Sequence, residues 1–175
     1  MRKICFALAA LLVSSTAQAD GELDKILSQF DKDRLANFDK TRSEALSEGL
    51  RGAPADVEIL TGALDGKPMP MDSGFDMTGT WKCRVIKVGG LLPLTPYGWF
   101  KCRITEDSLG WKVEKISGSQ RFTGYLYTQS DTDLVFVGAG HVNDDPARKY
   151  GDDPKENQVA IVSRLGRQKL VFEFP

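Results

Sequence analysis

The chain has 175 residues, of which 23 are Lys or Arg and 24 are Asp or Glu, so its formal net charge is −1 at pH 7. This balance argues against nucleic acid as the natural partner, and the length suits one domain with a substantial core. The charge is unevenly placed. Residues 20–50 carry eight acidic and five basic side chains, whereas residues 80–128 carry eight basic and three acidic ones.

Residues 1–19 have the pattern of a signal peptide. Arg2 and Lys3 precede an apolar run over residues 4–13, which is too short for a bilayer span of ~20 residues. Ala17 and Ala19 give the small-residue pattern that signal peptidase accepts. We expect cleavage after Ala19, export to the periplasm or beyond, and a mature chain with no transmembrane segment. That chain keeps 21 basic and 24 acidic residues, a net charge of −3. The alternative is a buried N-terminal helix.

Residues 20–66 are predicted to be helical. Apolar residues recur at helical spacing on one face, at Leu23, Ile26, Leu27 and Phe30. The pattern loses phase over residues 31–33 and resumes as far as Leu50. This predicts one bent helix or two, with Asp33 as a candidate N-cap for the second.

A further helix is expected from residue 54 or 55 to Leu64, with Pro54 tolerated at its start. The apolar stripe of the helical segment is expected to dock on the rest of the domain or to form a dimer. Its acidic polar face argues against a membrane-surface helix.

The residue pattern changes from helical to alternating at residue 79, after a Pro- and Gly-rich connector over residues 67–78. Candidate strands cover residues 80–88, 97–105, 109–117, 120–128, 133–139, 158–165 and 168–174. Short links between them favour an antiparallel β-meander or a small lipocalin-like barrel of about seven strands over residues 79–175. The predicted fold class is α+β.

Cys83 and Cys102 are the two cysteines expected in the mature chain, because Cys5 lies in the signal peptide. Alternation places Cys83 on the side of Trp81 and Cys102 on the side of Phe100, so both can face one way. In an oxidising compartment this predicts a disulfide between two neighbouring strands, worth about 3 kcal/mol. A metal site and two free thiols are the alternatives. The same side continues through Ile104, Trp111, Val113, Phe122 and Leu126, the predicted core.

The opposite side of these strands is basic. It carries Lys82, Arg84, Lys101, Arg103 and Lys112, with Glu114 as the acid. Like charges on neighbouring strands repel one another unless something neutralises them. One interpretation is a solvated face, covered by the acidic helices. The other is a binding face for an anionic envelope component or an envelope protein.

The link between the fifth and sixth strands is long and acidic. Its candidate ligand residues are Asn143, Asp144, Asp145, Asp152 and Asp153. Oxygen donors at this density suit calcium, although the spacing is not that of an EF-hand and Arg148 and Lys149 compete for the carboxylates. A polar surface loop is the alternative. No other cofactor is expected, and His141, the single histidine, is expected to be structural.

The sequence holds no paired-carboxylate site, His/Cys metal spacing, phosphate-binding glycine loop or nucleophile elbow. The leading hypothesis is therefore an exported, non-enzymatic binding or envelope-interaction protein. A small-ligand carrier that uses the barrel interior is the alternative. A hydrolase or metal-dependent enzyme that uses the acidic loop and His141 comes third. The pattern leaves the oligomeric state open.

Three stretches, 95–103, 118–121 and 143–146, resemble a bacterial exported family, the domain-of-unknown-function family numbered 4893. Residues 42–55 also fit, so the resemblance covers nearly the whole mature chain. It implies no activity. Members continue past the last strand, so we expect this chain to be shortened or its last strand to be unprotected. Separately, Gly79-Thr80-Trp81 is similar to the start of lipocalin-like and bacterial protease-inhibitor barrels, which implies fold alone.

Overall fold

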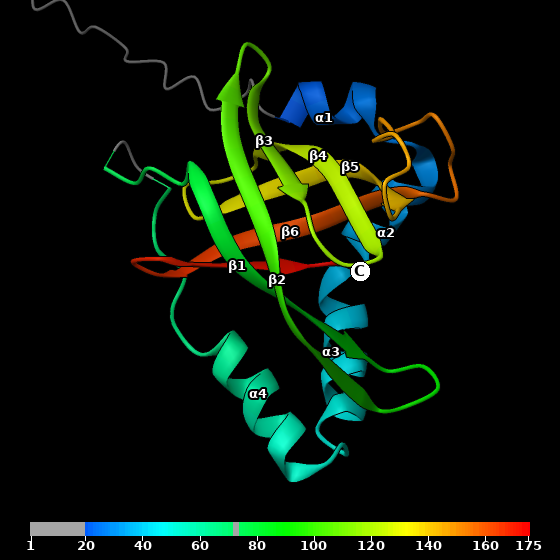
Figure 1. Ribbon diagram of the computed structural model, residues 1–175, viewed down its shortest axis with the longest axis vertical. Helices are drawn as coiled ribbons and strands as arrows, with labels where there is room; N and C mark the ends of the chain where they lie inside the picture. The colour runs from blue at the N-terminus through cyan, green and yellow to red at the C-terminus, as the bar shows by residue number, and fades with distance from the viewer. Residues whose placement is uncertain (1–19, 72–73) are drawn as a thin grey trace, which may run out of the picture.

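The computed structural model describes residues 20–71 and 74–175, and this part of the chain holds helices followed by strands (Figure 1). The helices are α1 (Asp20–Ile26), α2 (Gln29–Ala36), α3 (Phe38–Gly49) and α4 (Pro54–Leu64). The strands are β1 (Gly79–Val88), β2 (Leu94–Asp107), β3 (Gly110–Lys115), β4 (Gln120–Thr128), β5 (Asp133–Val142), β6 (Asn157–Gly166) and β7 (Lys169–Glu173). The predicted α+β class is confirmed. The expected signal peptide lies outside the described residues, so export remains a prediction.

The strands form one seven-stranded sheet in the order β1-β2-β3-β4-β5-β6-β7, and each pairs antiparallel with the next. This is the predicted meander. The sheet curls into a half-barrel, with β1–β3 in front of β5–β7 (Figure 1). It does not close, because β1 and β7 stand at opposite ends of the strand order.

Four strands are longer than the sequence predicted, β1 by one residue, β6 by one residue at each end, and β2 and β5 each by three residues at one end. β2 begins at Leu94 instead of 97, and β5 ends at Val142 instead of 139. The early start of β2 depends on a bulge, because the register shifts between Arg84 and Ile86 and then pairs Ile86 with Pro96. The ribbon therefore includes Pro96, which lies before the predicted start of the strand, while Pro93 stays in the loop between β1 and β2.

The concave side of the sheet holds the main core. The predicted inward residues Trp81, Ile104, Trp111, Val113, Phe122 and Leu126 all lie in this cluster. Phe136 has no exposed surface and fills the centre, with its ring 5.3 Å from that of Phe122 and 6.0 Å from that of Phe172. The interior is thus packed with aromatic side chains rather than hollow.

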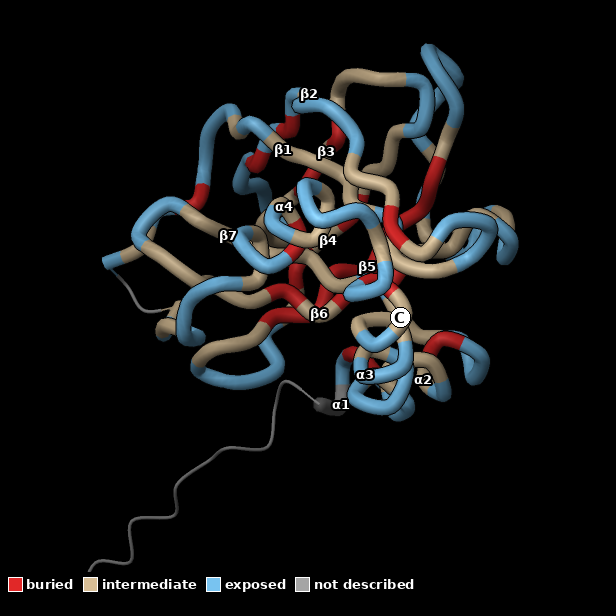
Figure 2. The backbone as a smooth tube through the Cα atoms, turned by 90° about the horizontal axis from the view of Figure 1, so that it is seen from below, coloured by how far each residue is buried: buried red, intermediate tan, exposed pale blue. Residues whose placement is uncertain are grey.

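The opposite face of β5 and β6 is covered by α1 and α2. Leu23 is buried against Val135 and Val137, with Ile26 and Leu27 packed beside them. Figure 2 shows the buried stretches of β5 and β6 next to these helices. Because both faces of β5 are covered, its residues from Leu134 to Gly140 are all buried.

The helix boundaries correct two predictions: residues 20–50 form three helices, α1 to α3, rather than one bent helix or two, and the N-cap is not Asp33. The chain breaks after Ile26 and α2 restarts with Ser28 as N-cap, whose hydroxyl oxygen accepts a hydrogen bond from the Asp31 amide at 3.1 Å. Asp33, predicted to cap a helix, lies inside α2. The break also changes which side of the helical segment faces the sheet. Phe30, predicted on the apolar face, is therefore 71% exposed, while Asp31 is 1% exposed.

Helices α3 and α4 pack on the extended β1–β2 ribbon. A Cβ added at Gly49 would lie 2.7 Å from Val88 Cγ1, and one at Gly52 would lie 2.8 Å from Leu94 Cβ. Both glycines therefore permit the turn between the helices to rest directly on the ribbon. Among residues 20–71 and 74–175, no helix combines the length and apolar character needed to cross a bilayer.

Candidate functional site

A disulfide joins Cys83 of β1 to Cys102 of β2, as predicted, with the Cα atoms 5.9 Å apart. The two cysteines are diagonal neighbours, because Cys83 pairs with Phe100 and Cys102 pairs with Trp81. The bond lies on the inner side of the two strands and fixes their separation. The outer side of the same strands carries the predicted basic residues.

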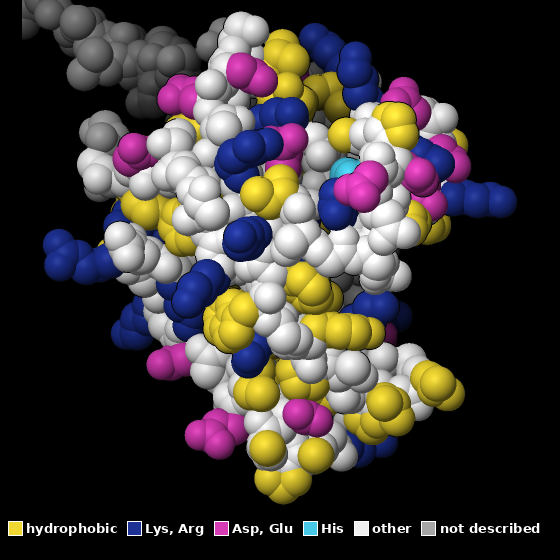
Figure 3. Space-filling view, in the orientation of Figure 1, with side chains coloured by type: hydrophobic (Ala, Val, Ile, Leu, Met, Phe, Trp, Pro, Cys, Tyr) yellow, Lys and Arg dark blue, Asp and Glu magenta, His cyan; other side chains and the backbone are white. Residues whose placement is uncertain are grey.

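Lys82 and Lys101 lie directly opposite each other on this outer side. Both are exposed, and neither side chain forms an ion pair or hydrogen bond within the described residues. Figure 3 shows Lys and Arg side chains gathered over β1–β3 on the side that faces the viewer. Two opposed ammonium groups without an anion destabilise the sheet, so this pair needs an explanation.

Two of the five predicted basic residues share one acid within the sheet. Glu114 Oε2 lies 3.1 Å from Arg103 Nη2, and Glu114 Oε1 lies 3.0 Å from Lys112 Nζ. Burial alone would raise the pKa of Glu114, but hydrogen bonds and charges from Lys112 and Arg103 outweigh it and hold the pKa below its usual value. Arg103 and Lys112 therefore have an internal partner that Lys82 and Lys101 lack, although the single charge of Glu114 offsets only one of the two cations.

Trp99 lies on the same surface, although it was not among the residues predicted to form it. It pairs with Arg84 across the strands, and the Arg84 Cζ lies 4.6 Å from the centre of the indole ring. Trp99 is 62% exposed. Side chains alternate between the two faces of β2, so the pattern that places Lys101 and Arg103 outward also places Trp99 outward. The position of Trp99 could therefore have been predicted from the sequence.

Arg84 lies beneath that ring. Its Nε is buried and makes no hydrogen bond within the described part of the chain. The cation–π contact holds the guanidinium and the indole together. We call Lys82, Arg84, Trp99 and Lys101 the open basic face.

The acidic helices do not cover the open basic face. Helices α1 and α2 pack on β5 and β6, while α3 and α4 contact the part of the ribbon beyond the bulge. Lys82 and Lys101 remain exposed. The expected cover of this surface by the acidic helices is therefore wrong, while its interpretation as a solvated face stays open.

The acidic loop does not converge on one point. Asp144 pairs with Arg121 at 3.0 Å, Asp153 pairs with Arg148 at 3.3 Å, and Asp152 accepts a hydrogen bond from the Lys149 amide at 2.8 Å. The amide of Asn143 donates to the Ser119 carbonyl, and the amide of Asp145 donates to the Val142 carbonyl. Across residues 20–71 and 74–175 no three His, Cys, Asp or Glu side chains group to hold a metal. Calcium binding by this loop remains a prediction.

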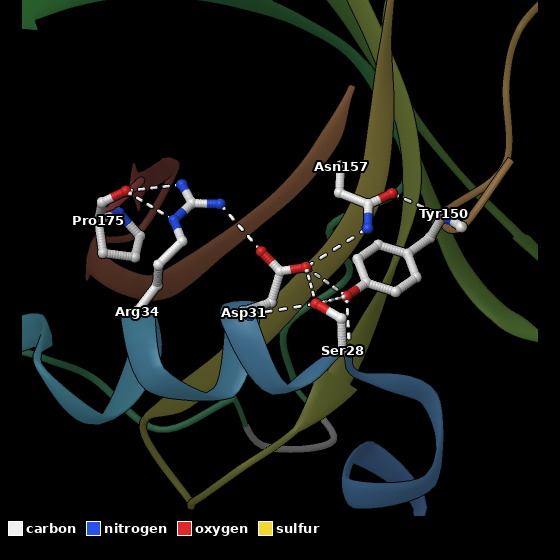
Figure 4. A network of polar contacts seen from close by, with 7 residues as sticks. Ser28, Asp31, Arg34, Tyr150, Asn157 and Pro175 are labelled. Carbon is white, nitrogen blue, oxygen red and sulfur yellow. Dashed lines mark hydrogen bonds and ion pairs between the residues drawn. The ribbon is translucent and has the colours of Figure 1, made fainter. Parts of the chain in front are cut away.

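Tyr150, at the centre of the loop, has a structural contact instead (Figure 4). Its hydroxyl donates a short hydrogen bond to buried Asp31, which also accepts from Ser28 Oγ at 2.7 Å and Arg34 Nη1 at 3.0 Å. Burial alone would raise the pKa of Asp31, but hydrogen bonds from Tyr150, Ser28 and Arg34 hold it below its usual value. The loop is thereby fastened to α2.

His141 and the loop carboxylates do not assemble a catalytic group. His141 lies on β5 opposite Arg121, and its Nδ1 is buried without a hydrogen-bond partner in the described structure. Asp144, the nearest candidate along the chain, has a side chain that is 93% exposed. This geometry offers little support for acid–base chemistry, which needs groups within hydrogen-bond reach of one another.

A cavity of about 350 Å³ opens at the rim of the half-barrel, lined by Pro70, Met71, Trp111, Thr128, Ser130, Asp131 and Leu134. It lies apart from the open basic face. Because aromatic residues fill the centre of the sheet, this rim cavity is one space in the described structure that a small-ligand carrier would use.

Comparison with protein families gave one match. The family model described as "Domain of unknown function (DUF4893)" matches residues 24–175, which include every helix from α2 onward and all seven strands. Comparisons with curated proteins and with solved structures returned no significant match.

Proposed function

This chain belongs to the family described as domain of unknown function DUF4893, and because membership carries no activity we propose a function from its own surface. We propose that it is an exported, non-enzymatic binding protein whose open basic face engages an anionic component of the cell envelope. The signal-peptide pattern of residues 1–19 supports the compartment.

One observation carries the proposal: three cations of the open basic face have no anion within the described residues. Lys82 and Lys101 are opposed and unpaired, while the next two cations of the sheet, Arg103 and Lys112, share Glu114. A sheet that needed only solubility would not require adjacent like charges, which cost stability. An external anion supplies the missing counter-charge and desolvates the exposed pair on binding.

The test compares two double variants of equal charge change. Lys82→Gln/Lys101→Gln removes two cations of the open basic face, and Arg103→Gln/Lys112→Gln removes two that are paired with Glu114. Binding to immobilised polyglutamate and polyphosphate is measured over a range of salt concentrations. We expect the first variant to lower the slope of log Kd against log salt by about 2, one for each lysine, and the second to change it little.

If both variants lower the salt slope equally, net charge, and not the open basic face, controls binding. No salt-dependent binding of the parent protein to either polymer would overturn the proposal. Export is checked separately, by mass spectrometry of the protein from the envelope fraction, which should begin at Asp20.

A second candidate, carriage of a small apolar ligand, is favoured by the rim cavity. Its volume of about 350 Å³ is at the low end of ligand sites, which span roughly 300–1,000 Å³. Trp111 lines it and would report occupancy by fluorescence. A hydrophobic dye that alters this fluorescence in the parent but not in Thr128→Phe, which narrows the cavity from an exposed lining position, would support carriage. No change in the parent would remove this candidate.

A further inference from the structure

The open basic face offers a flat aromatic surface as well as charge. Trp99 is 62% exposed, and its ring lies 4.6 Å from the Cζ of Arg84, the residue directly opposite on β1. The guanidinium of Arg84, whose Nε is buried, therefore covers part of the ring, while most of the Trp99 surface remains exposed to solvent. The indole is thereby held in place before any ligand arrives, which lowers the entropic cost of stacking.

The lysine pair and the indole ring lie next to each other along the β1–β2 ribbon. The opposed lysines Lys82 and Lys101 lie two residues from the Arg84–Trp99 pair, a distance of about 7 Å along the strand. A ligand that matches this order carries an anionic group next to a flat ring. The site is open and lies away from the rim cavity and from the groove between α3 and α4. It therefore suits a segment of an extended polymer better than a small molecule that must be enclosed.

We infer that the ligand of the open basic face is an acidic polysaccharide. The C–H face of a sugar ring stacks on the electron-rich face of Trp99, and carboxylate or sulfate groups of the chain pair with Lys82, Lys101 and the exposed edge of the Arg84 guanidinium. The inference rests on the proposed function and adds the chemical class of the ligand.

Two other anionic ligands fit less well. Single-stranded nucleic acid also combines rings with charge, but its binding depends on a long basic groove. This face has three unpaired cations on a chain whose net charge is −1. An anionic membrane favours apolar side chains that enter the acyl region, whereas Trp99 lies against Arg84. Sugar polymers need neither feature.

The experiment titrates the full-length mature protein with four probes at one salt concentration. These are polygalacturonate, neutral dextran, poly(dT), and vesicles that contain phosphatidylglycerol. The test variant is Trp99→Ala, which removes the ring. The control variant is Lys112→Gln, which removes a cation of the same sheet that is paired with Glu114. Melting curves check that both variants fold, which is expected because Trp99 lies outside the core cluster.

We expect polygalacturonate to bind most tightly and dextran to bind weakly. Trp99→Ala should weaken polygalacturonate binding by about tenfold or more, as for aromatic residues at the centre of an interface, and Lys112→Gln should leave it within about twofold. Quenching or a spectral shift of tryptophan fluorescence should disappear in Trp99→Ala, because Trp81 and Trp111 pack against the core.

Unchanged polygalacturonate affinity in Trp99→Ala would overturn the inference and leave a charge-only site, with the proposed function intact. Tighter binding of poly(dT) or of vesicles would replace the polysaccharide with that ligand class. If none of the three anionic probes binds while polyglutamate or polyphosphate does, the inference falls and the proposed function stands; if no polyanion binds, both fall.

Discussion

Asp31 shows how a single buried charge is accommodated in this protein. Its carboxylate is 1% exposed and accepts hydrogen bonds from Ser28, Tyr150 and Arg34. Arg34 in turn donates to the Pro175 carbonyl at 2.6 Å. The contacts tie α2, the acidic loop and the end of the described chain together at one point (Figure 4). A buried charge is tolerated only with such partners.

We predict that Asp31→Asn lowers the free energy of unfolding by about 2–4 kcal/mol at neutral pH. The folded-state pKa of Asp31 lies below its usual value of 3.8, so its stabilising effect is complete above the unfolded-state pKa. The effect is lost as pH falls through the folded-state pKa. Melting temperatures of parent and variant should therefore converge as pH falls from about 5 to 2. Asp33→Asn, an exposed change in the same helix, is the control, and a constant gap would contradict the assignment.

The opposed lysines lead to a second prediction at the level of single residues. Lys101→Glu places an acid opposite Lys82 and converts repulsion into attraction, so the melting temperature should rise by about 1–3 °C. The rise should shrink at high salt, because exposed charge pairs are screened. The same variant should lose polyanion binding. Lower stability together with intact polyanion binding would show that repulsion between the lysines does not destabilise the sheet and that Lys101 does not contribute to binding.

Alternation along the strands allowed most of the sheet to be predicted from sequence, because side chains on a strand face opposite sides in turn. The inner residues Trp81 and Val113, both cysteines and the basic side all followed from it. The pattern did not identify the partner of each charge. That Glu114 neutralises Arg103 depends on the pairing of Arg103 with Glu114 between β2 and β3, which alternation alone does not determine.

The helix boundaries were predicted less well, because they depend on distant contacts. The amide of Ser28 donates to Tyr150 Oη at 3.0 Å across 122 residues of sequence. That contact accompanies the break between α1 and α2, and a local pattern search cannot detect it. Lys115 is a similar case. Alternation along β3 places its side chain on the inner side, with Val113. Its two acceptors, the Ser117 and Gln120 carbonyls, depend on the turn after β3, which alternation does not determine.

A glycine pair explains the close pairing of β4 and β5. Gly124 lies opposite Gly138, and a Cβ on Gly124 would lie 2.4 Å from the Val137 carbonyl oxygen and 2.6 Å from the Phe136 ring. We predict that Gly124→Ala lowers the free energy of unfolding by about 1–3 kcal/mol through overpacking. Gly62→Ala is the control, because its Cβ would meet nothing within 4 Å and alanine favours the helix. Urea unfolding measures both, and equal effects would contradict the prediction.

The disulfide contributes to the β1–β2 pair. Cys83 and Cys102 close a loop with a sequence separation of 19, for which chain entropy predicts about 3 kcal/mol. Cys83→Ser/Cys102→Ser should therefore lower the midpoint of urea unfolding without altering the far-ultraviolet spectrum. The parent protein in reductant should shift similarly, and the variant should not shift further. Two alkylatable thiols in the exported protein would instead mean that the bond does not form.

At the scale of the whole molecule, the acidic and basic parts of the chain lie over different strands on the outer side of one sheet. The helices that bring the acidic charge cover β5 and β6, while the open basic face lies on β1 and β2. The α1–α2 layer supplies one of two clusters of buried apolar residues. Without it, Val135 and Val137 on the outer face of β5 would be exposed to water, so the helices and the sheet depend on each other for stability.

This dependence predicts one cooperative unfolding transition, in which helix loss by circular dichroism and core loss by tryptophan fluorescence share a midpoint. Leu23→Ala, at the buried contact of α1 with β5, should lower both midpoints together, by about 2–3 kcal/mol of unfolding free energy. Phe30→Ala is the matched control, because that side chain is 71% exposed and should change little. If Leu23→Ala melted the helices first and left the fluorescence transition in place, α1 and α2 would be an accessory layer on a sheet that is stable alone.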